Sequence, residues 1–174
     1  SLGPYVFVFL IPAITMRSFA EEKKAGTMEL LFTKPLRDWD IILGKYLASF
    51  LLVLFALIPT IVYYYSLYSL GNPPGNLDTP GIIGSYIGLV MLAASFCAVG
   101  IFSSCITPNQ IVAFIVASFL CFLLFTGFES ISTLSFWSAN ALQVKQLGIL
   151  YHYESMSRGL IDTRDIVYFL SVIF

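Results

Sequence analysis

A run of 25 residues without a charged side chain, residues 82–106, limits what this chain can fold into more than any other feature. About 20 consecutive apolar residues suffice for a helix to cross the hydrocarbon core of a bilayer. Over the whole chain 58% of the residues are hydrophobic and 11% are charged, whereas soluble domains carry about 25% charged residues. Because a helix satisfies its own backbone hydrogen bonds in lipid, the sequence predicts an all-α integral membrane protein.

The charged residues gather in one stretch, residues 17–45, between two apolar segments. This stretch holds six of the nine Lys and Arg residues and five of the ten Asp and Glu residues. Such a charge density does not enter lipid, and cationic residues next to spans favour the cytoplasmic side. We therefore expect residues 17–39 to form a cytoplasmic loop that contacts a soluble partner. We expect Lys45, near the inner end of the next span, to extend toward the lipid headgroups.

Within this loop the sequence predicts a short helix that begins after Thr27 and ends before Pro35. The Thr27 hydroxyl suits a free amide of the first turn, and Glu29 suits the positive end of the helix dipole. Gly26 allows the backbone to turn before the cap, and Pro35 does not extend the helix. A helix of about eight residues is marginal in water, so something must pack on it. From these residues alone, an amphipathic connector on the membrane surface and a docking helix are equally open.

The same loop carries a motif that resembles the signature of ABC-2 type transporter permeases. It reads EEKKAGTMELLFTKP over residues 21–35, and Trp39 and the Leu43-Gly44-Lys45 triplet follow it. In that family the loop holds the coupling helix, which docks in a cleft of a separate ATPase subunit and transmits nucleotide-driven motion. The resemblance implies this role for eight residues: Glu21, Glu22, Gly26, Thr27, Glu29, Leu30, Leu31 and Pro35.

The resemblance also implies the six-helix transmembrane fold of that family, of which we expect this chain to lack the first span and most of the last. We expect a single transmembrane domain over residues 1–174. Its segments follow in order: a partial span at 1–16, the coupling loop at 17–39, a span at 40–70, an outer loop at 71–80, spans at 81–106 and 107–128, an outer region of re-entrant or amphipathic helices at 129–162, and the start of the last span at 163–174.

The segments after residue 80 contain two local patterns. Small residues recur four apart in the charge-free run, as Gly84 with Gly88 and Ala94 with Ala98, a spacing that allows close helix approach in lipid. Chance scatter of glycine in a membrane helix is an equal alternative. At the following turn, we expect Thr107 to cap the next helix with Pro108 as its first residue.

A second motif, YHYESMSRGLIDTRD at residues 151–165, precedes the expected last span. Gly159 suits the end of one helix and Asp162 the cap of the next. The motif resembles a block found in a subset of ABC-2 permeases, above all those of gliding motility, and less closely the permeases of nitrous-oxide-reductase maturation systems. Three cations, Lys145, Arg158 and Arg164, lie on the expected outer side and run against the charge rule.

Residues that would mark a metal site or catalysis are sparse. Three cysteines lie in apolar segments without Cys-x-x-Cys spacing, which predicts neither a disulfide framework nor a zinc site: Cys97, Cys105 and Cys121. His152, Glu154 and Met156 alternate, but one histidine and one methionine make a thin site, and a structural role is the better interpretation. Glu129 is either a proton or substrate site or a plain interfacial carboxylate. No Walker A motif is present.

We therefore expect no catalytic residue, metal or cofactor in this chain, with ATP and Mg²⁺ bound by the partner ATPase. The expected function is that of a multi-pass permease subunit in a bacterial inner membrane, in gliding motility or associated export. A structural anchor of an envelope or motility complex, or a permease of a nitrous-oxide-reductase-type maturation system, is the alternative. The expected partners are the ATPase subunit, a second permease subunit in a homo- or heterodimer, an auxiliary envelope subunit and membrane lipids. The net charge of −1 does not favour nucleic acid.

Overall fold

The computed structural model describes residues 2–27, 29, 37–70, 78–133, 141–160 and 162–174. In these ranges the chain is helical and contains no strand, which confirms the predicted all-α class. Four helical stretches are long and apolar enough to cross a membrane: Gly3–Ala25, Asp38–Leu70, Thr79–Ile106 and Gln110–Ser132. The positions predicted for docking at Leu30, Leu31 and Pro35, and the helix predicted after Thr27, lie outside the described residues.

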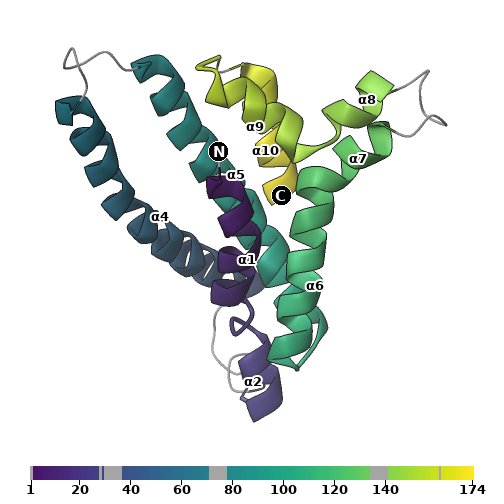
Figure 1. Ribbon diagram of the computed structural model, residues 1–174. Coiled ribbons are helices and arrows are strands. Elements are labelled where there is room, and N and C mark those ends of the chain that lie inside the picture. The colour runs from purple at the N-terminus through teal and green to yellow at the C-terminus, as the bar shows by residue number, and fades with distance from the viewer. Residues whose placement is uncertain (1, 28, 30–36, 71–77, 134–140, 161) are drawn as a thin grey trace.

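Helix α5 (Thr79–Ile106) is the central element of the bundle (Figure 1). It packs against α1 (Gly3–Thr15), α4 (Asp38–Leu70), α6 (Gln110–Phe122) and two helices near the C-terminus. Its buried residues Leu92, Phe96 and Cys97 meet apolar side chains of its neighbours in one core cluster. A helix that is apolar around its circumference is stable only when other helices or lipid surround it, and α5 is in that position.

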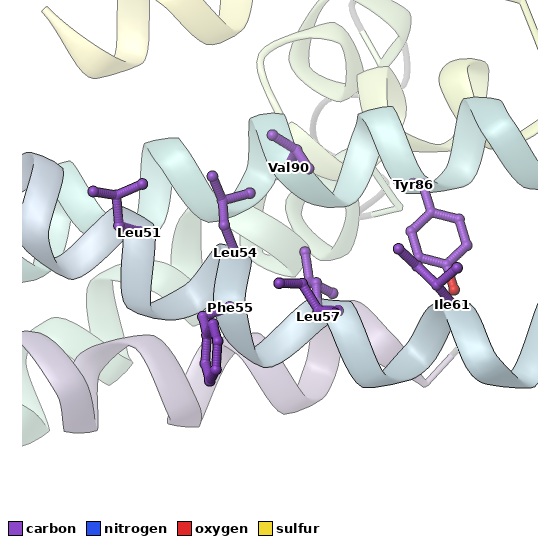
Figure 2. Close-up of a pocket in the computed structure, with 8 residues that line it drawn as sticks. Leu51, Leu54, Phe55, Leu57, Ile61, Tyr86 and Val90 are labelled. Atoms are coloured by element: carbon purple, nitrogen blue, oxygen red, sulfur yellow. The ribbon is translucent and has the colours of Figure 1, made fainter.

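Helix α4 lies along one side of α5 and exposes most of its apolar surface. Two tyrosine hydroxyls join the helices, because Tyr46 donates to the Ala94 carbonyl at 3.2 Å and Tyr86 donates to the Thr60 carbonyl at 2.9 Å. An apolar groove of about 440 Å³ follows their line of contact, with Leu54, Leu57 and Val90 among its lining residues (Figure 2). An exposed surface of this composition suits contact with lipid chains.

The described chain after α6 forms shorter elements. A π-helix, η1 (Leu123–Gly127), continues into α7 (Phe128–Ser132), and the elements α8 (Ala141–Gln146), α9 (Ile149–Ser157) and α10 (Thr163–Ile173) follow. Helices α7 to α9 gather at the end of the bundle opposite to α2 (Ala20–Ala25) (Figure 1). The turn between α5 and α6 lies at the α2 end, since both of these helices contact α2.

The cap of α6 differs from the prediction. Helix α6 begins at Gln110, and Asn109 is its N-cap, with its side-chain oxygen accepting from the Ile111 amide at 3.0 Å. The expectation that Thr107 is the cap and Pro108 the first helical residue is wrong, because the Thr107 hydroxyl instead accepts from the Asn109 amide at 3.2 Å and closes the preceding turn. At the other motif the prediction is confirmed: Gly159 has φ +80° after α9, and Asp162 caps α10.

Glycines of α5 lie where other elements approach its backbone. A Cβ on Gly84 would lie 2.2 Å from the Met156 carbonyl oxygen, and a Cβ on Gly88 would lie 3.1 Å from the Tyr153 ring. The structure therefore places both glycines against α9. Of the two alanines with the same spacing, Ala94 is buried beside Tyr46 and Ala98 is half-buried.

Candidate functional site

Helix α2 forms a compact polar element just after α1. Acidic Glu21 and Glu22 occupy its first turn and basic Lys23 and Lys24 its last turn, an order that suits the helix dipole. Gly26 ends the helix with φ +67°, and the Gly26 and Thr27 amides bond back to the carbonyls of Lys23 and Glu22. This is the bonding of a Schellman motif, in which glycine takes the left-handed position at no steric cost.

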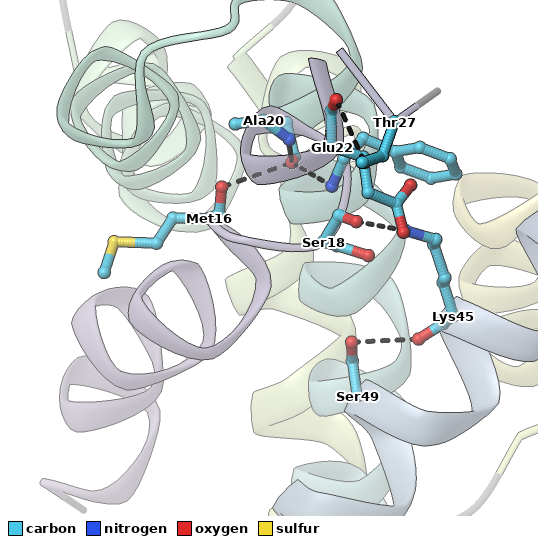
Figure 3. A network of polar contacts seen from close by, with 9 residues as sticks. Met16, Ser18, Ala20, Glu22, Thr27, Lys45 and Ser49 are labelled. Carbon is cyan, nitrogen blue, oxygen red and sulfur yellow. Dashed lines mark hydrogen bonds and ion pairs between the residues drawn. The ribbon is translucent and has the colours of Figure 1, made fainter. Parts of the chain in front are cut away.

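The N-terminal end of α2 takes its cap from a distant helix. The Ser104 hydroxyl of α5 accepts from the Phe19 amide at 2.8 Å and from the Ala20 amide at 3.0 Å (Figure 3). The same hydroxyl donates to the Met16 carbonyl at 3.2 Å. The first amides of a helix have no partner within it, and the residue before α2, Phe19, supplies no side-chain cap. Ser104 therefore ties the start of α2 to α5.

Lys45 ties the same segment to α4. Its ammonium lies 2.6 Å from Glu22 Oε1 and donates to the Ser18 carbonyl (Figure 3). It also lies 4.2 Å from the centroid of the Phe19 ring. The Lys45 side chain is 19% exposed, so it does not extend toward headgroups as expected. A carboxylate, a carbonyl and a ring face together replace the water that a buried ammonium loses.

Two further contacts complete the attachment. The Lys23 ammonium donates to the Cys105 carbonyl near the C-terminal end of α5, where carbonyls lack helical partners and favour a cation. Thr15, at the end of α1, lies so close to Gly100 that a Cβ there would come within 2.1 Å of the Thr15 hydroxyl oxygen. We name residues 16–27 the anchored segment. It is held against α4 and α5, and its displacement must move those helices or break these contacts.

The anchored segment leaves a second set of side chains exposed. Glu21, Lys24, Gly26 and Thr27 are exposed, and so is Glu29 just beyond the segment. Glu22, which the resemblance grouped with the docking residues, is instead engaged with Lys45 inside the chain. One face of α2 therefore fixes it to the bundle while Glu21 and Lys24 remain available for a partner.

The contacts of Ser104 and Lys45 with the anchored segment are not evident from the sequence. Ser104 is separated from Ala20 by 84 positions, and nothing local to either residue indicates the contact. The one available signal was Lys45, since a lysine inside an apolar helix requires a polar partner. Its partner Glu22 lies in the same charged stretch, but the resemblance implies docking for Glu22 and the sequence predicts headgroup contact for Lys45.

The part of the chain that the structure describes contains no group of three or more His, Cys, Asp or Glu residues arranged to hold a metal ion. Of the three alternating residues, His152 pairs with Asp165 at 2.6 Å and Met156 is fully buried in the core. Their positions agree with the structural interpretation of these side chains. The His152 pair lies near α8 and α10, away from the anchored segment.

Exchange of Lys45 and Glu22 for neutral residues tests the attachment. We expect a double-mutant cycle of Lys45→Gln and Glu22→Gln to give a coupling energy of about 1 kcal/mol in unfolding, because both side chains are mostly buried. The measurement is chemical unfolding of the full-length chain in detergent. Glu21→Gln with Lys45→Gln is the matched control, since Glu21 is exposed, and this cycle should show no coupling.

A helical bundle of membrane-spanning length with a charged segment fixed to one end is typical of multi-pass membrane proteins. The family model described as ABC-2 family transporter protein matches residues 4–163, and the chain belongs to this family. It is thus a membrane component of an ABC-2 type transporter. No curated protein and no solved structure matches the chain.

Proposed function

We propose that the anchored segment couples this permease to a separate ATPase subunit. The observation that carries the proposal is the division of α2 into two faces. Ala20, Glu22 and Lys23 contact α5 or α4, while Glu21 and Lys24 are exposed. The serine cap and the half-buried Lys45 fix one face of α2 to the bundle, so a force on its exposed face is passed to α4 and α5.

The contacts support a direct route for force. Closure of an ATP-bound ATPase dimer would push on the exposed face of α2 and on Glu29. Ser104 and Lys45 would carry the displacement to α5 and α4. Because α5 packs against α1, α4, α6, α9 and α10, a shift of its end changes the packing of the whole bundle. We propose that two such permeases, in a homo- or heterodimer, open a path between them.

The finer role rests on the resemblance of residues 151–165 to gliding-motility permeases. We propose export linked to gliding motility in a bacterial inner membrane, with an auxiliary envelope subunit as a further partner. A membrane anchor whose ATPase governs assembly is the alternative. If an ATPase-dead variant abolishes substrate flux, the result supports export. If the wild type shows no flux and the ATPase-dead variant abolishes assembly of the complex, the result supports the role of a membrane anchor.

The docking proposal predicts that reversing exposed charges separates the two subunits. We expect the double variant Glu21→Arg with Glu29→Arg to reduce co-purification of the ATPase at least tenfold, because two exposed carboxylates become cations at the contact. The measurement is the yield of ATPase retained on the affinity-tagged full-length permease.

Arg164→Glu is the control for this experiment. It reverses an exposed charge in α10, away from α2, and should leave the ATPase yield unchanged. Equal ATPase yields from wild type and the Glu21/Glu29 variant, with the permease folded in both, would show that these carboxylates do not contact the ATPase.

A further inference from the structure

A polar cavity of about 430 Å³ lies at the end of the bundle opposite to the anchored segment. Its walls come from the start of α1, from η1, from α7 and from α9. Cavities of this size hold small ligands or the headgroups of larger ones. None of the contacts that tie α2 to α4 and α5 involves it.

Three aromatic rings form one side of this cavity. Phe125 is 1% exposed, and its ring centroid lies 5.4 Å from that of Tyr5 at an interplanar angle of 88°. The Tyr153 ring lies 6.5 Å from Phe125 at 63°. Tyr153 is 4% exposed and Tyr5 is 46% exposed, so Tyr5 is the ring of these three that a ligand can reach. Aromatic ring faces attract ammonium groups.

The π-helix determines which side chains reach the cavity. Ala113 is buried on the inner side of α6, and Glu129 follows sixteen positions later. In an uninterrupted α-helix, which turns about 100° per residue, the side chain sixteen positions after Ala113 would point about 160° away from the Ala113 side chain. Glu129 would then face outward. The extra residue that a π turn accommodates removes about 100° of this offset. Glu129 therefore lines the cavity, and Phe125, within η1, reaches it as well.

The charges at the cavity are balanced but incompletely paired. Glu129 pairs with Lys145 at 3.3 Å. Glu154 and Arg158 lie four positions apart on one side of α9, and both line the cavity. Neither Glu154 nor Arg158 forms an ion pair within the part of the chain that the structure describes. The half-buried Glu154 carboxylate and the exposed Arg158 guanidinium thus line the same space without an ion-pair contact to each other or to another described residue.

We propose that this cavity binds a zwitterionic group, with an ammonium between Glu154 and Tyr5 and an anionic group at Arg158. A ligand with a single charge would engage only one of these two side chains, whereas a zwitterion offers a counter-charge to both. Phosphoethanolamine has the required chemistry. It occurs both as a free molecule and as the headgroup of a phospholipid, and the cavity lies beside apolar helices of membrane-spanning length.

The test is ligand-induced stabilisation of the full-length chain in detergent. Three probes are titrated separately: dihexanoyl phosphatidylethanolamine, dihexanoyl phosphatidylglycerol and O-phosphoethanolamine. We expect the first to raise the melting temperature in a saturable manner at concentrations at least tenfold lower than phosphatidylglycerol requires. O-phosphoethanolamine acting as strongly as the lipid identifies a free zwitterion as the ligand, and a much weaker action identifies the lipid headgroup.

Two substitutions locate the binding site. Glu154→Gln and Arg158→Gln should each weaken the apparent affinity for phosphatidylethanolamine about tenfold, because each removes one charge-assisted contact. Asp38→Asn and Arg164→Gln are the matched controls, since they neutralise exposed charges that do not line the cavity. They should leave the affinity for phosphatidylethanolamine unchanged. Equal affinity for the two lipids in the wild type overturns the proposal without any variant. Unchanged affinity in both cavity variants overturns it as well.

Discussion

Replacing Asp165 with alanine is expected to lower the free energy of unfolding by about 3 kcal/mol, because it leaves a buried polar group without its hydrogen-bond partner. Asp165 is 4% exposed and lies in the first turn of α10. Its Oδ1 lies 2.6 Å from Nδ1 of His152 in α9. Its other oxygen, Oδ2, is buried without a hydrogen-bond partner among the described residues, so this carboxylate depends on His152.

The large effect is expected because His152 joins three helices. Its Nε2 lies 2.9 Å from the Gln146 carbonyl of α8, and a carbonyl only accepts, so Nε2 carries a proton and donates. The imidazole stacks on the Tyr168 ring of α10 at a centroid distance of 4.0 Å. The Tyr168 hydroxyl in turn donates to the Leu147 carbonyl at 2.6 Å. Removing Asp165 leaves Nδ1 buried without its partner and weakens the attachment of α10 to α8 and α9.

Two substitutions make this prediction specific. Asp162→Ala removes the cap of α10 three residues earlier and should cost only about 1 kcal/mol. Asp165→Asn keeps a hydrogen-bonding group next to Nδ1 and should recover more than half of the loss seen with alanine. The measurement is chemical unfolding of the full-length chain in detergent. If Asp165→Ala destabilised the protein no more than Asp162→Ala, the pair would not stabilise the α8–α10 region.

The elements that sequence alone predicted are those set by local chemistry. Helix α5 covers the charge-free run, because length and composition suffice to specify a helix in lipid. Gly159 and Asp162 act at helix ends as expected, because a positive φ and a cap depend on only a few neighbouring residues. The cap of α6 was missed because Thr107 and Asn109 are both competent, and the packing of the turn decides between them.

The candidate site could be predicted only in part, since its composition is local but its contacts are not. The charge pattern located the polar segment, and the resemblance supplied its expected role. Which carboxylate is exposed depends on how α4 returns beside α2, and this return brings Lys45 to Glu22 instead of to the headgroups. The serine that caps α2 lies on α5 and follows Ala20 by 84 positions, so no window of sequence contains both partners.

The second large effect is expected at the glycines where backbones meet. Gly84→Ala should lower the free energy of unfolding by about 3 kcal/mol, the upper end of the usual cost of overpacking. The new Cβ would lie 2.2 Å from the Met156 carbonyl oxygen and 3.0 Å from the Gly159 Cα. Both are backbone atoms, so relief requires α9 to move away from α5. Gly100→Ala should cost a similar amount, since Thr15 is fully buried and its Cβ lies 2.9 Å away.

Two other glycines provide the comparison that separates packing from helix propensity. A Cβ on Gly44 meets nothing within 4 Å, so Gly44→Ala in α4 should stabilise the chain by up to about 1 kcal/mol through propensity alone. The change in the free energy of unfolding for Gly88→Ala should lie between those for Gly84→Ala and Gly44→Ala. The nearest neighbour of its new Cβ, at 3.1 Å, is the Tyr153 side chain, which moves more easily than backbone. This order, measured by chemical unfolding in detergent, follows from distance and neighbour type. Equal effects at Gly84 and Gly44 would mean that α9 does not press on α5, and the spacing of Gly84 and Gly88 would then have no packing role.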